Sequence, residues 1–332
     1  MRTAEIDAPA PVEPPRRRKR RWVTALLAIP VLVVVAATVL RLVGVDGDRH
    51  TMAALALTPY LTAFAAFITL LALVAGRRAL MATALIATVS LGSVLVPRSL
   101  DDGAHTGDGQ RIRVMTANLL VGGADPTTLL TLARDSRVDV LAFQELTPAA
   151  VEALDAAGMR RQFPYRVLRA EAGGSGSGIV AKVPLRQIVL VEESVLEQVA
   201  VVADLSGPTD VEILSVHVLP GVHNAGAYRI WQRELADLPS PDAGGRPRIL
   251  AGDFNATLDH AAMTRIIDRG YWDAAELTGE GLRPTWSQYP WGPPVTIDHI
   301  LVDRRITATS LAVYDLPGSD HNAVVAELVL PQ

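Results

Sequence analysis

Two short polar signals, set in apolar surroundings, contain the residues best suited to do chemistry in this chain. The first follows the apolar run 249–251 and contains Asp253 and Asn255. Because these residues lie two apart, an extended chain directs both side chains to the same face. A carboxylate and an amide delivered together by a strand end suit a metal-bound phosphate, since hard divalent cations prefer oxygen ligands.

The second signal is the adjacent pair Asp320 and His321, at the end of a predicted loop. Asp320 offers a further oxygen ligand, and His321 offers an imidazole that titrates near neutral pH. Together the two signals indicate a metal-dependent phosphoesterase.

Four more polar residues lie in or directly after predicted strands. Each has a plain structural interpretation as well: a turn residue, a surface carboxylate, a core histidine and a strand-end charge that could pair with Arg304. In layered α/β folds, however, functional sites are built at strand ends. The four residues, each with its predicted strand, are Asn118 (112–117), Glu145 (138–143), His217 (211–218) and Asp298 (296–302).

The elements that must position these residues alternate between strand and helix from Arg111 onward. Further strands are predicted at 178–181, 199–205, 249–252 and 324–329, and helices at 126–136 and 228–238. Asp125 and Pro126 suit the start of the first helix, as N-cap and first-turn residue. The pattern predicts an α/β catalytic domain over residues 111–332.

Seven motifs in this domain occur in the order found in the endonuclease/exonuclease/phosphatase superfamily, which residues 111–330 resemble. The resemblance implies a deoxyribonuclease-I-like fold, a four-layer α/β sandwich of two packed mixed sheets with helices outside. The site would lie where the strand ends of both sheets meet. The motifs are Met115–Asn118, Leu141–Glu145, Gly178–Leu185, Ser215–His217, Gly252–Asn255, Ile297–Ile300 and Ser319–His321.

The resemblance also implies a metal site and a water-activating residue. Glu145, helped by Asn118, would hold Mg²⁺ or Mn²⁺, with Asp320 close by. Asp253 would orient or deprotonate the attacking water. Attack on a phosphodiester needs a cation, a base for water and donors aimed at the non-bridging oxygens.

The remaining roles implied by the resemblance concern the phosphate. Asn255 would hold a phosphate oxygen, while His217 and His321, the latter oriented by Asp298, would donate hydrogen bonds to the phosphoryl group. Two candidates for the general base stay open, Asp253 and the His321–Asp298 pair.

Three neighbouring residues and one aromatic segment have weaker claims. His299 is adjacent to Asp298, so a strand directs it to the opposite face and we leave it out of the site. His223 and Asn224 could reach the substrate or serve only as loop residues. Between 286 and 294 lie Trp286, Tyr289, Pro290, Trp291, Pro293 and Pro294, which suit a membrane interface, a substrate cleft or a stiff surface loop.

Residues 22–97 contain three long apolar runs, near 22–40, 52–75 and 80–96. Each approaches the length that crosses the hydrocarbon core as a helix, so we expect three transmembrane helices. A cleaved signal peptide is a rival for the first run, but that run is long and lacks a small-residue cleavage site. Residues 1–21 form a basic tail and residues 98–110 a flexible linker.

The basic residues predict the orientation in the membrane. Six lie at 16–21, before the first run, and Arg77 and Arg78 lie between the second and third. We therefore expect the N-terminus in the cytoplasm and the catalytic domain outside it, in a multi-pass protein of the cell membrane.

Charge and composition limit the kinds of ligand and chemistry that this chain can have. Of 31 Lys and Arg and 35 Asp and Glu, 12 and 8 fall in residues 1–110, so residues 111–332 hold 19 and 27 and have a formal charge of −8. That balance is unfavourable for long nucleic acid, which binds basic faces. The absence of cysteine excludes disulfides and thiolate chemistry.

The first interpretation is a membrane-anchored phosphodiesterase that requires Mg²⁺ or Mn²⁺ and acts on a phospholipid or other envelope phosphoester. One alternative is an extracellular nuclease that cleaves DNA. A second is a non-catalytic membrane protein that binds a phosphorylated ligand, although a binder has no need of a water-activating Asp253. No obligate protein partner is evident.

Overall fold

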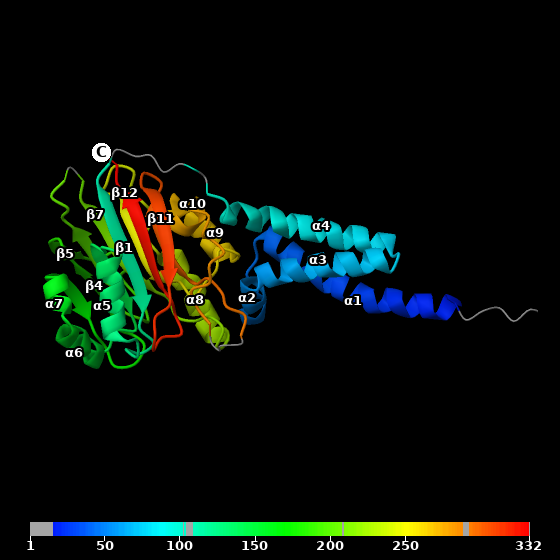
Figure 1. Cartoon of the computed structure of the whole chain (residues 1–332), viewed down its shortest axis with the longest axis horizontal. Helices are drawn as coiled ribbons and strands as arrows, with labels where there is room; N and C mark the ends of the chain where they lie inside the picture. The colour runs from blue at the N-terminus through cyan, green and yellow to red at the C-terminus, as the bar shows by residue number, and fades with distance from the viewer. Residues whose placement is uncertain (1–15, 102, 104–108, 208, 288–291, 332) are drawn as a thin grey trace, which may run out of the picture.

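A computed structural model describes residues 16–101, 103, 109–207, 209–287 and 292–331, and divides them into a helical bundle and a two-sheet domain (Figure 1). The bundle comprises α1 (Arg16–Val43), α2 (Arg49–Ala56), α3 (Thr58–Val74) and α4 (Arg78–Leu95). The domain begins with β1 at Arg111.

The domain contains two mixed sheets of six strands each. The first has the order β11 (Thr307–Tyr314), β12 (Ala323–Val329), β1 (Arg111–Asn118), β2 (Val140–Gln144), β4 (Ser177–Ala181), β3 (Tyr165–Arg169). The second has the order β5 (Leu185–Ile188), β6 (Ala200–Ala203), β7 (Val211–His217), β8 (Arg248–Asp253), β10 (Asp298–Asp303), β9 (Tyr271–Asp273). In each sheet the two central strands, β1 with β2 and β7 with β8, are parallel, whereas the other pairs are antiparallel.

Apolar side chains fill three layers and hold the two sheets together. One buried cluster, which includes Val114, Ile213 and Ile300, lies between the sheets. A second packs the outer face of the first sheet against α5 (Pro126–Asp135), α6 (Pro148–Ala157) and α7 (Met159–Gln162). A third packs the second sheet against α8 (Ala225–Asp237) and α9 (Ala261–Asp268). The predicted four-layer sandwich is confirmed.

Local sequence signals account for the predicted elements and miss several others. Asp125 caps α5 by accepting from the backbone N of Thr128, as the pattern predicted. The strands β3, β5, β9 and β11 and the helices α6, α7, α9 and α10 (Ala274–Leu277) were not predicted. Most of these are short or only half-buried, so their hydrophobic periodicity is weak.

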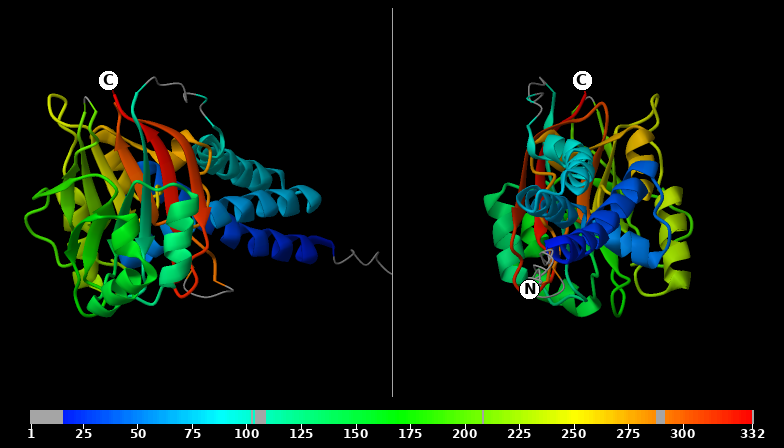
Figure 2. Two further views of the ribbon diagram at one scale, coloured as in Figure 1. Left: turned by 60° about the vertical axis from the view of Figure 1, so that its left-hand side comes forward. Right: turned by 90° about the vertical axis from the view of Figure 1, so that its right-hand side faces the viewer.

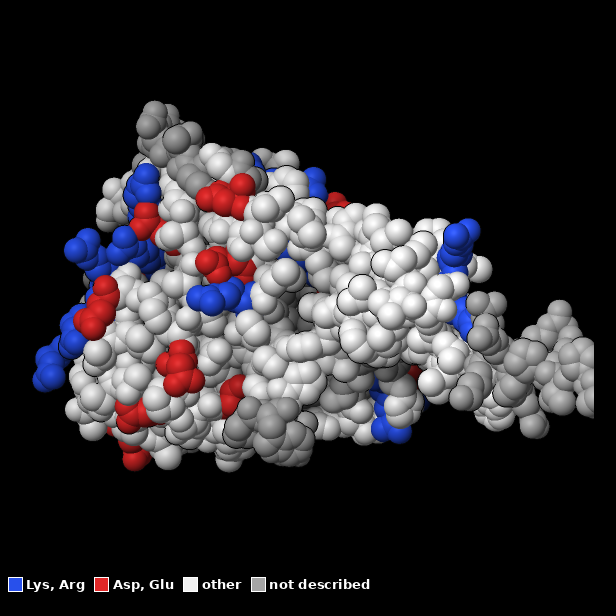
Figure 3. All heavy atoms as spheres, turned by 45° about the vertical axis from the view of Figure 1, so that its right-hand side comes forward, with Lys and Arg blue, Asp and Glu red and all other residues white. Residues whose placement is uncertain are grey.

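The long helices α1, α3 and α4 leave the domain side by side (Figure 2) and pack through small residues such as Ala65, Ala84 and Ala87. Two segments, Trp22–Val43 and Arg78–Ser99, are long and apolar enough to cross a membrane, and a third span is possible if α2 and α3 count as one. On the face drawn in Figure 3, most of the bundle surface is uncharged.

The predicted second span, 52–75, is broken in the structure. The chain bends by 69° between α2 and α3, so only α3 runs along the bundle. Pro59 accounts for the break, since it occupies the first turn of α3 and has no N–H to continue the helix. The helix α2 (Arg49–Ala56) lies instead at the junction between the bundle and the domain (Figure 1).

Residues 98 and 99, at the start of the segment predicted as a linker, belong to a folded turn. Val96–Ser99 forms a 3₁₀ turn, and the buried Arg98 pairs with Asp259 at 3.1 Å and with Glu276 at 3.1 Å. Linker residues 102 and 104–108 lie outside the described residues. The contacts of Arg98 tie the end of α4 to the domain.

Candidate active site

The register of the central strands brings the predicted site residues to one edge of the domain. In the second sheet Asp253 is opposite His217 on β7 and opposite Asp298 on β10. In the first sheet Asn118 ends β1, and Glu145 directly follows its partner strand β2. Because parallel strands end at the same edge, both sheets deliver their polar residues to one place.

A glycine permits the close approach that sets this register. A Cβ built on Gly252 would lie 2.0 Å from the carbonyl oxygen of Val216 in β7. Any larger residue would therefore push β8 away from β7. Gly252 precedes Asp253 directly, so this contact determines where the carboxylate lies.

Asn118 links the two sheets. Its Nδ2 donates to Oε1 of Glu145 at 3.2 Å and to Oδ2 of Asp253 at 3.1 Å. Its Oδ1 accepts from the backbone N of Leu120. Glu145 is further held by the backbone N of Val121, which donates to Oε2 at 2.7 Å.

The backbone around these residues is strained. Leu120, Val121, Glu145 and Asn255 are non-glycine residues with positive φ, at 46°, 51°, 55° and 46°. Such conformations cost roughly 1–3 kcal/mol each and persist only where surrounding contacts hold them. Three side chains hold this backbone by accepting hydrogen bonds from it. The backbone N of Leu120 donates to Asn118, that of Val121 to Glu145, and that of Asn255 to Asp253.

Asn255 is held rigidly beside Asp253. Its backbone N donates to Oδ1 of Asp253 at 2.8 Å, and its Nδ2 donates to the carbonyl of Val218 at 2.9 Å and to Oδ2 of Asp253 at 3.2 Å. The amide is therefore fixed at the same edge as the carboxylate.

His321 is oriented by Asp298. Its Nδ1 lies 3.1 and 2.9 Å from the two carboxylate oxygens of Asp298, and its Nε2 lies 3.8 Å from Oδ2 of Asp253 and 3.8 Å from Oδ1 of Asp320. Trp286 fixes Asp320 from the other side, because its Nε1 donates to Oδ2 at 3.0 Å. The indole was predicted only as part of an aromatic segment.

The pKa values of this group follow from burial and charge. Burial raises the pKa of Asp253 to about 7, with the charge of His321 opposing it and that of Asp298 adding to it. Burial alone would lower the pKa of His321, but the carboxylates of Asp298 and Asp253 raise it to about 10. Burial, and then the charge of His321, lower the pKa of His217 to about 3, so its imidazole is neutral.

Oxygen ligands suited to a divalent cation are present at this edge. Oδ1 of Asp320 is buried and accepts no hydrogen bond from the described residues, so it has a free ligand position. The carboxylate of Glu145 lines the same cavity. The predicted metal residues Glu145, Asn118 and Asp320 therefore offer the hard oxygen donors that Mg²⁺ or Mn²⁺ prefers.

A second cluster also has the spacing of a metal site. Ligand atoms of Asp253, Asp298 and His321 all lie within 4.8 Å of one another. Nδ1 of His321 is already engaged by Asp298, however, and a protonated imidazole does not bind metal. This cluster suits proton handling better than metal binding.

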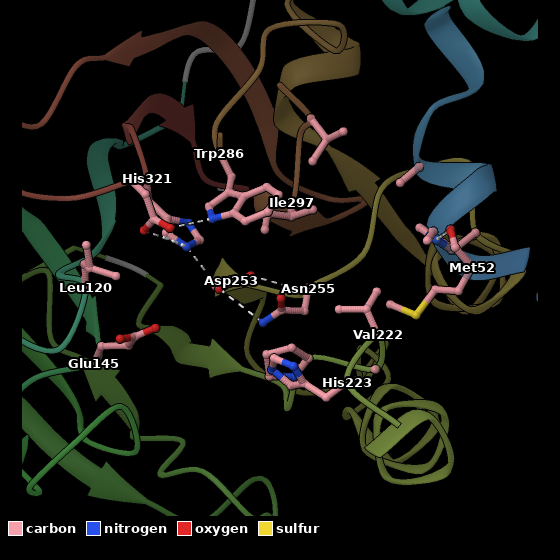
Figure 4. A pocket seen from close by; sticks show the side chains of 17 residues that line it. Met52, Leu120, Glu145, Val222, His223, Asp253, Asn255, Trp286, Ile297 and His321 are labelled. Atoms are coloured by element: carbon pink, nitrogen blue, oxygen red, sulfur yellow. Dashed lines mark hydrogen bonds and ion pairs between the residues drawn. The ribbon is translucent and has the colours of Figure 1, made fainter. Parts of the chain in front are cut away.

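These residues surround a cavity of about 330 Å³ (Figure 4). Five of the eight predicted site residues line it: Glu145, Asp253, Asn255, Asp320 and His321. Asn118 and Asp298 support it through hydrogen bonds, whereas His217 is buried behind it and is not among the lining residues described. Apart from His260, the lining residues that sequence reasoning missed are apolar, and three of them, Met52, Ala53 and Ala56, come from α2.

The structure distinguishes the weaker candidates that line the cavity from those that do not. His299 is on the opposite side of β10, as predicted, where Nδ1 contacts Asp273 at 2.6 Å and Nε2 contacts the carbonyl of Ala256. Asn224 caps α8, whereas His223 lines the cavity. Of the aromatic segment, Tyr289, Pro290 and Trp291 lie outside the described residues.

Comparisons with known proteins agree with this architecture. The family described as the endonuclease/exonuclease/phosphatase family matches residues 115–321. A crystal structure of an endonuclease/exonuclease/phosphatase from Beutenbergia cavernae is 18% identical with a TM-score of 0.53, covering 67% of this chain and 72% of that one.

Truncated TDP2 from Caenorhabditis elegans is 15% identical with a TM-score of 0.51, covering 66% of this chain and 97% of that one. At these identities the likeness concerns the fold. The search of curated proteins finds no match. Since the family match spans more than half of the chain and includes the strand-end residues described above, the chain belongs to the endonuclease/exonuclease/phosphatase family.

Proposed function

We propose that this protein is a membrane-anchored, divalent-metal-dependent phosphodiesterase that hydrolyses a phospholipid or another phosphoester of the cell envelope. The observation that carries the proposal is the arrangement around Asn118, whose single amide binds both Glu145 and Asp253. A metal-ligating carboxylate and a water-activating carboxylate thereby face one cavity that also contains His321.

Each residue has a part in the attack of water on the phosphodiester. Asp253 accepts a proton from the attacking water, the phosphorus–oxygen bond to the leaving alcohol breaks, and the departing oxygen takes a proton from solvent. His321 donates from Nε2 to a phosphoryl oxygen as charge develops there. Asn255 donates from Nδ2 to another oxygen of the phosphate, and exchanges its hydrogen bond to Asp253 for this one. Glu145, Asn118 and Asp320 would hold Mg²⁺ or Mn²⁺, which would supply Lewis-acid stabilisation of the phosphoryl charge.

The hydrogen bonds favour Asp253 over the His321–Asp298 pair as the base. Asp298 contacts Nδ1 of His321 through both of its oxygens, which stabilises the protonated ring. A protonated ring is a donor and not a base. His217 lies opposite Asp253 in the strand register, is buried and neutral, and its Nδ1 has no hydrogen-bond partner among the described residues.

The bundle supports the membrane anchor and its orientation. The start of α1 and the turn between α3 and α4, with Arg77 and Arg78, lie at the same end of the bundle, away from the domain (Figure 1). We therefore place that end in the cytoplasm and the domain on the outer side.

The test uses the full chain, purified in detergent, with bis(p-nitrophenyl) phosphate and Mg²⁺ or Mn²⁺. We expect metal-dependent turnover that falls by about 10²-fold or more in Asp253→Asn and His321→Gln. Asp135→Asn is the matched control, since Asp135 is exposed on α5 and pairs with its neighbour Arg134.

Plasmid DNA is the second substrate in the same assay. Rapid DNA cleavage that weakens steeply with salt would favour the nuclease alternative. Absence of turnover on both substrates, with the variants folded like the parent, would favour a protein that only binds a phosphorylated ligand.

A further inference from the structure

The membrane-side helix α2 forms one wall of the catalytic cavity. Met52, Ala53 and Ala56 lie on one face of α2 and line the same cavity as Asp253 and His321. In Figure 4 the side chain of Met52 points from α2 toward Val222, across from the polar residues. The cavity thus has a polar side made by the strand ends and an apolar side that includes α2.

Polar contacts hold α2 and its flanking residues on the domain. The buried carboxylate of Asp46 accepts from the backbone N of Ala261 and of Ala262, at the start of α9, at 2.6 and 2.9 Å. His260 contacts the carbonyl of Met52 through Nε2 at 2.9 Å. These contacts are buried, so the wall is a fixed part of the site.

Contacts on both sides of α2 add to this attachment. Arg41, at the end of α1, pairs with Asp259 at 2.8 Å, and the hydroxyl of Tyr60 in α3 donates to the carbonyl of Pro294 at 2.7 Å. Arg49 donates to the carbonyl of His223, and His223 lines the cavity. The catalytic cavity therefore lies directly beside the helices that are long enough to cross a membrane.

We infer that the apolar side formed by α2 is a subsite for the hydrocarbon of a lipid phosphodiester. The inference rests on the proposed function and specifies its substrate class. A lipid whose phosphate reaches Asp253 and His321 would lay its first methylene groups against Ala53 and Ala56, and its chain would continue toward the bundle. Burying methylene groups against an apolar wall is favourable, so an alkyl chain should strengthen binding measurably.

The chain offers a matched pair of substitutions for the test. Ala53 and Ala54 are adjacent, exposed residues of α2, but of the two only Ala53 is among the cavity-lining residues that the structure describes. Ala53→Gln and Ala54→Gln therefore make the same chemical change inside and outside the subsite, and neither alters a catalytic residue. The substrates are p-nitrophenyl methyl phosphate and p-nitrophenyl octyl phosphate, at one detergent concentration.

For the full-length parent we expect kcat/KM to be at least about tenfold higher for the octyl ester than for the methyl ester. Ala53→Gln should lower the octyl value by about tenfold and the methyl value much less, because the amide places a polar group on the apolar wall that the longer chain covers. Ala54→Gln should match the parent on both esters.

Two other results are distinguishable. Turnover of the methyl ester without an octyl preference, or equal effects of Ala53→Gln and Ala54→Gln, would overturn the subsite and leave the proposed function standing. Absence of metal-dependent turnover of either ester by the parent would overturn the proposed function, and the subsite with it.

Discussion

Nδ2 of Asn118 lies 3.1 Å from Oδ2 of Asp253, and this hydrogen bond joins the last residue of β1 in one sheet to the last residue of β8 in the other. The same nitrogen donates to Glu145. One side chain thereby fixes the distance between the carboxylate assigned to the metal and the carboxylate assigned to water.

Asn118→Ala should lower kcat/KM on an aryl phosphodiester by about 10- to 100-fold, because both carboxylates lose the donor that positions them. The apparent affinity for Mg²⁺ should fall as well, which a metal titration of the rate measures. Asn322→Ala is the control, since Asn322 directly follows His321 but its side chain donates to the carbonyl of Pro284. Equal losses in the two variants would contradict a linking role for Asn118.

Gly252→Ala should destabilise the domain by more than about 2 kcal/mol, because the added Cβ would overlap the carbonyl oxygen of Val216. Thermal unfolding in detergent measures the effect. Gly92→Ala, in α4, is the control, since a Cβ there has nothing within 4 Å and Ala favours a helix. An unfolding midpoint of Gly252→Ala equal to the parent's would show that β7 and β8 can separate freely.

The strand ends that carry the polar residues of the candidate site could be predicted from the sequence, for a physical reason. Asn118, Glu145 and Asp253 follow apolar strands, so strand prediction alone directs them to the ends of central strands. The apolar half was not predicted. Ala53 and Ala56 belong to an apolar run that looks like an ordinary span, and their contact with the cavity is a long-range one.

Two local signals could have revealed this second half. Thr58 and Pro59 are typical of the start of a helix, although they lie in the middle of the apolar run 52–75. A new helix that begins there breaks the predicted span. Asp46 and Asp48 are acidic residues in a short loop between apolar runs, and both cap helices. That Asp46 caps a helix of the domain, some two hundred residues away in the chain, is tertiary information that local patterns do not contain.

His217 predicts how stability depends on pH. Its pKa is lowered from 6.5 to about 3 in the folded protein, chiefly by burial. Below pH 6.5 the unfolded chain therefore binds a proton that the folded chain does not, so this contribution is present above pH 6.5 and is lost as pH falls toward 3. The loss approaches about 1.4 kcal/mol per pH unit.

His217→Asn removes this titration. The free energy of unfolding, measured with denaturant between pH 5 and 8, should therefore fall less steeply in the variant than in the parent on the acid side. Identical slopes for the two proteins would mean that His217 is protonated in the folded state.

Asp46→Ala should loosen α2 from the domain, whereas Asp48→Ala should not. Asp46 accepts from α9, but Asp48 accepts from His50 and Thr51 at the start of α2 itself. Hydrogen exchange of the backbone amides at 257–263 should therefore rise in Asp46→Ala, while Asp48→Ala should affect only the first turn of α2. Protection at 257–263 that is unchanged in Asp46→Ala would contradict this attachment.

The orientation in the membrane is the prediction on which access to an envelope substrate depends. The chain has no cysteine, so single cysteines report sidedness without background. In intact cells a membrane-impermeant maleimide should label Glu152→Cys, exposed on α6 of the domain, and should not label Ala79→Cys, exposed near the turn with Arg77 and Arg78. Permeabilisation should expose the second cysteine. The reverse pattern would place the cavity in the cytoplasm and would direct the search for substrates to the inner leaflet, where Arg77 and Arg78 would then have failed to set the topology.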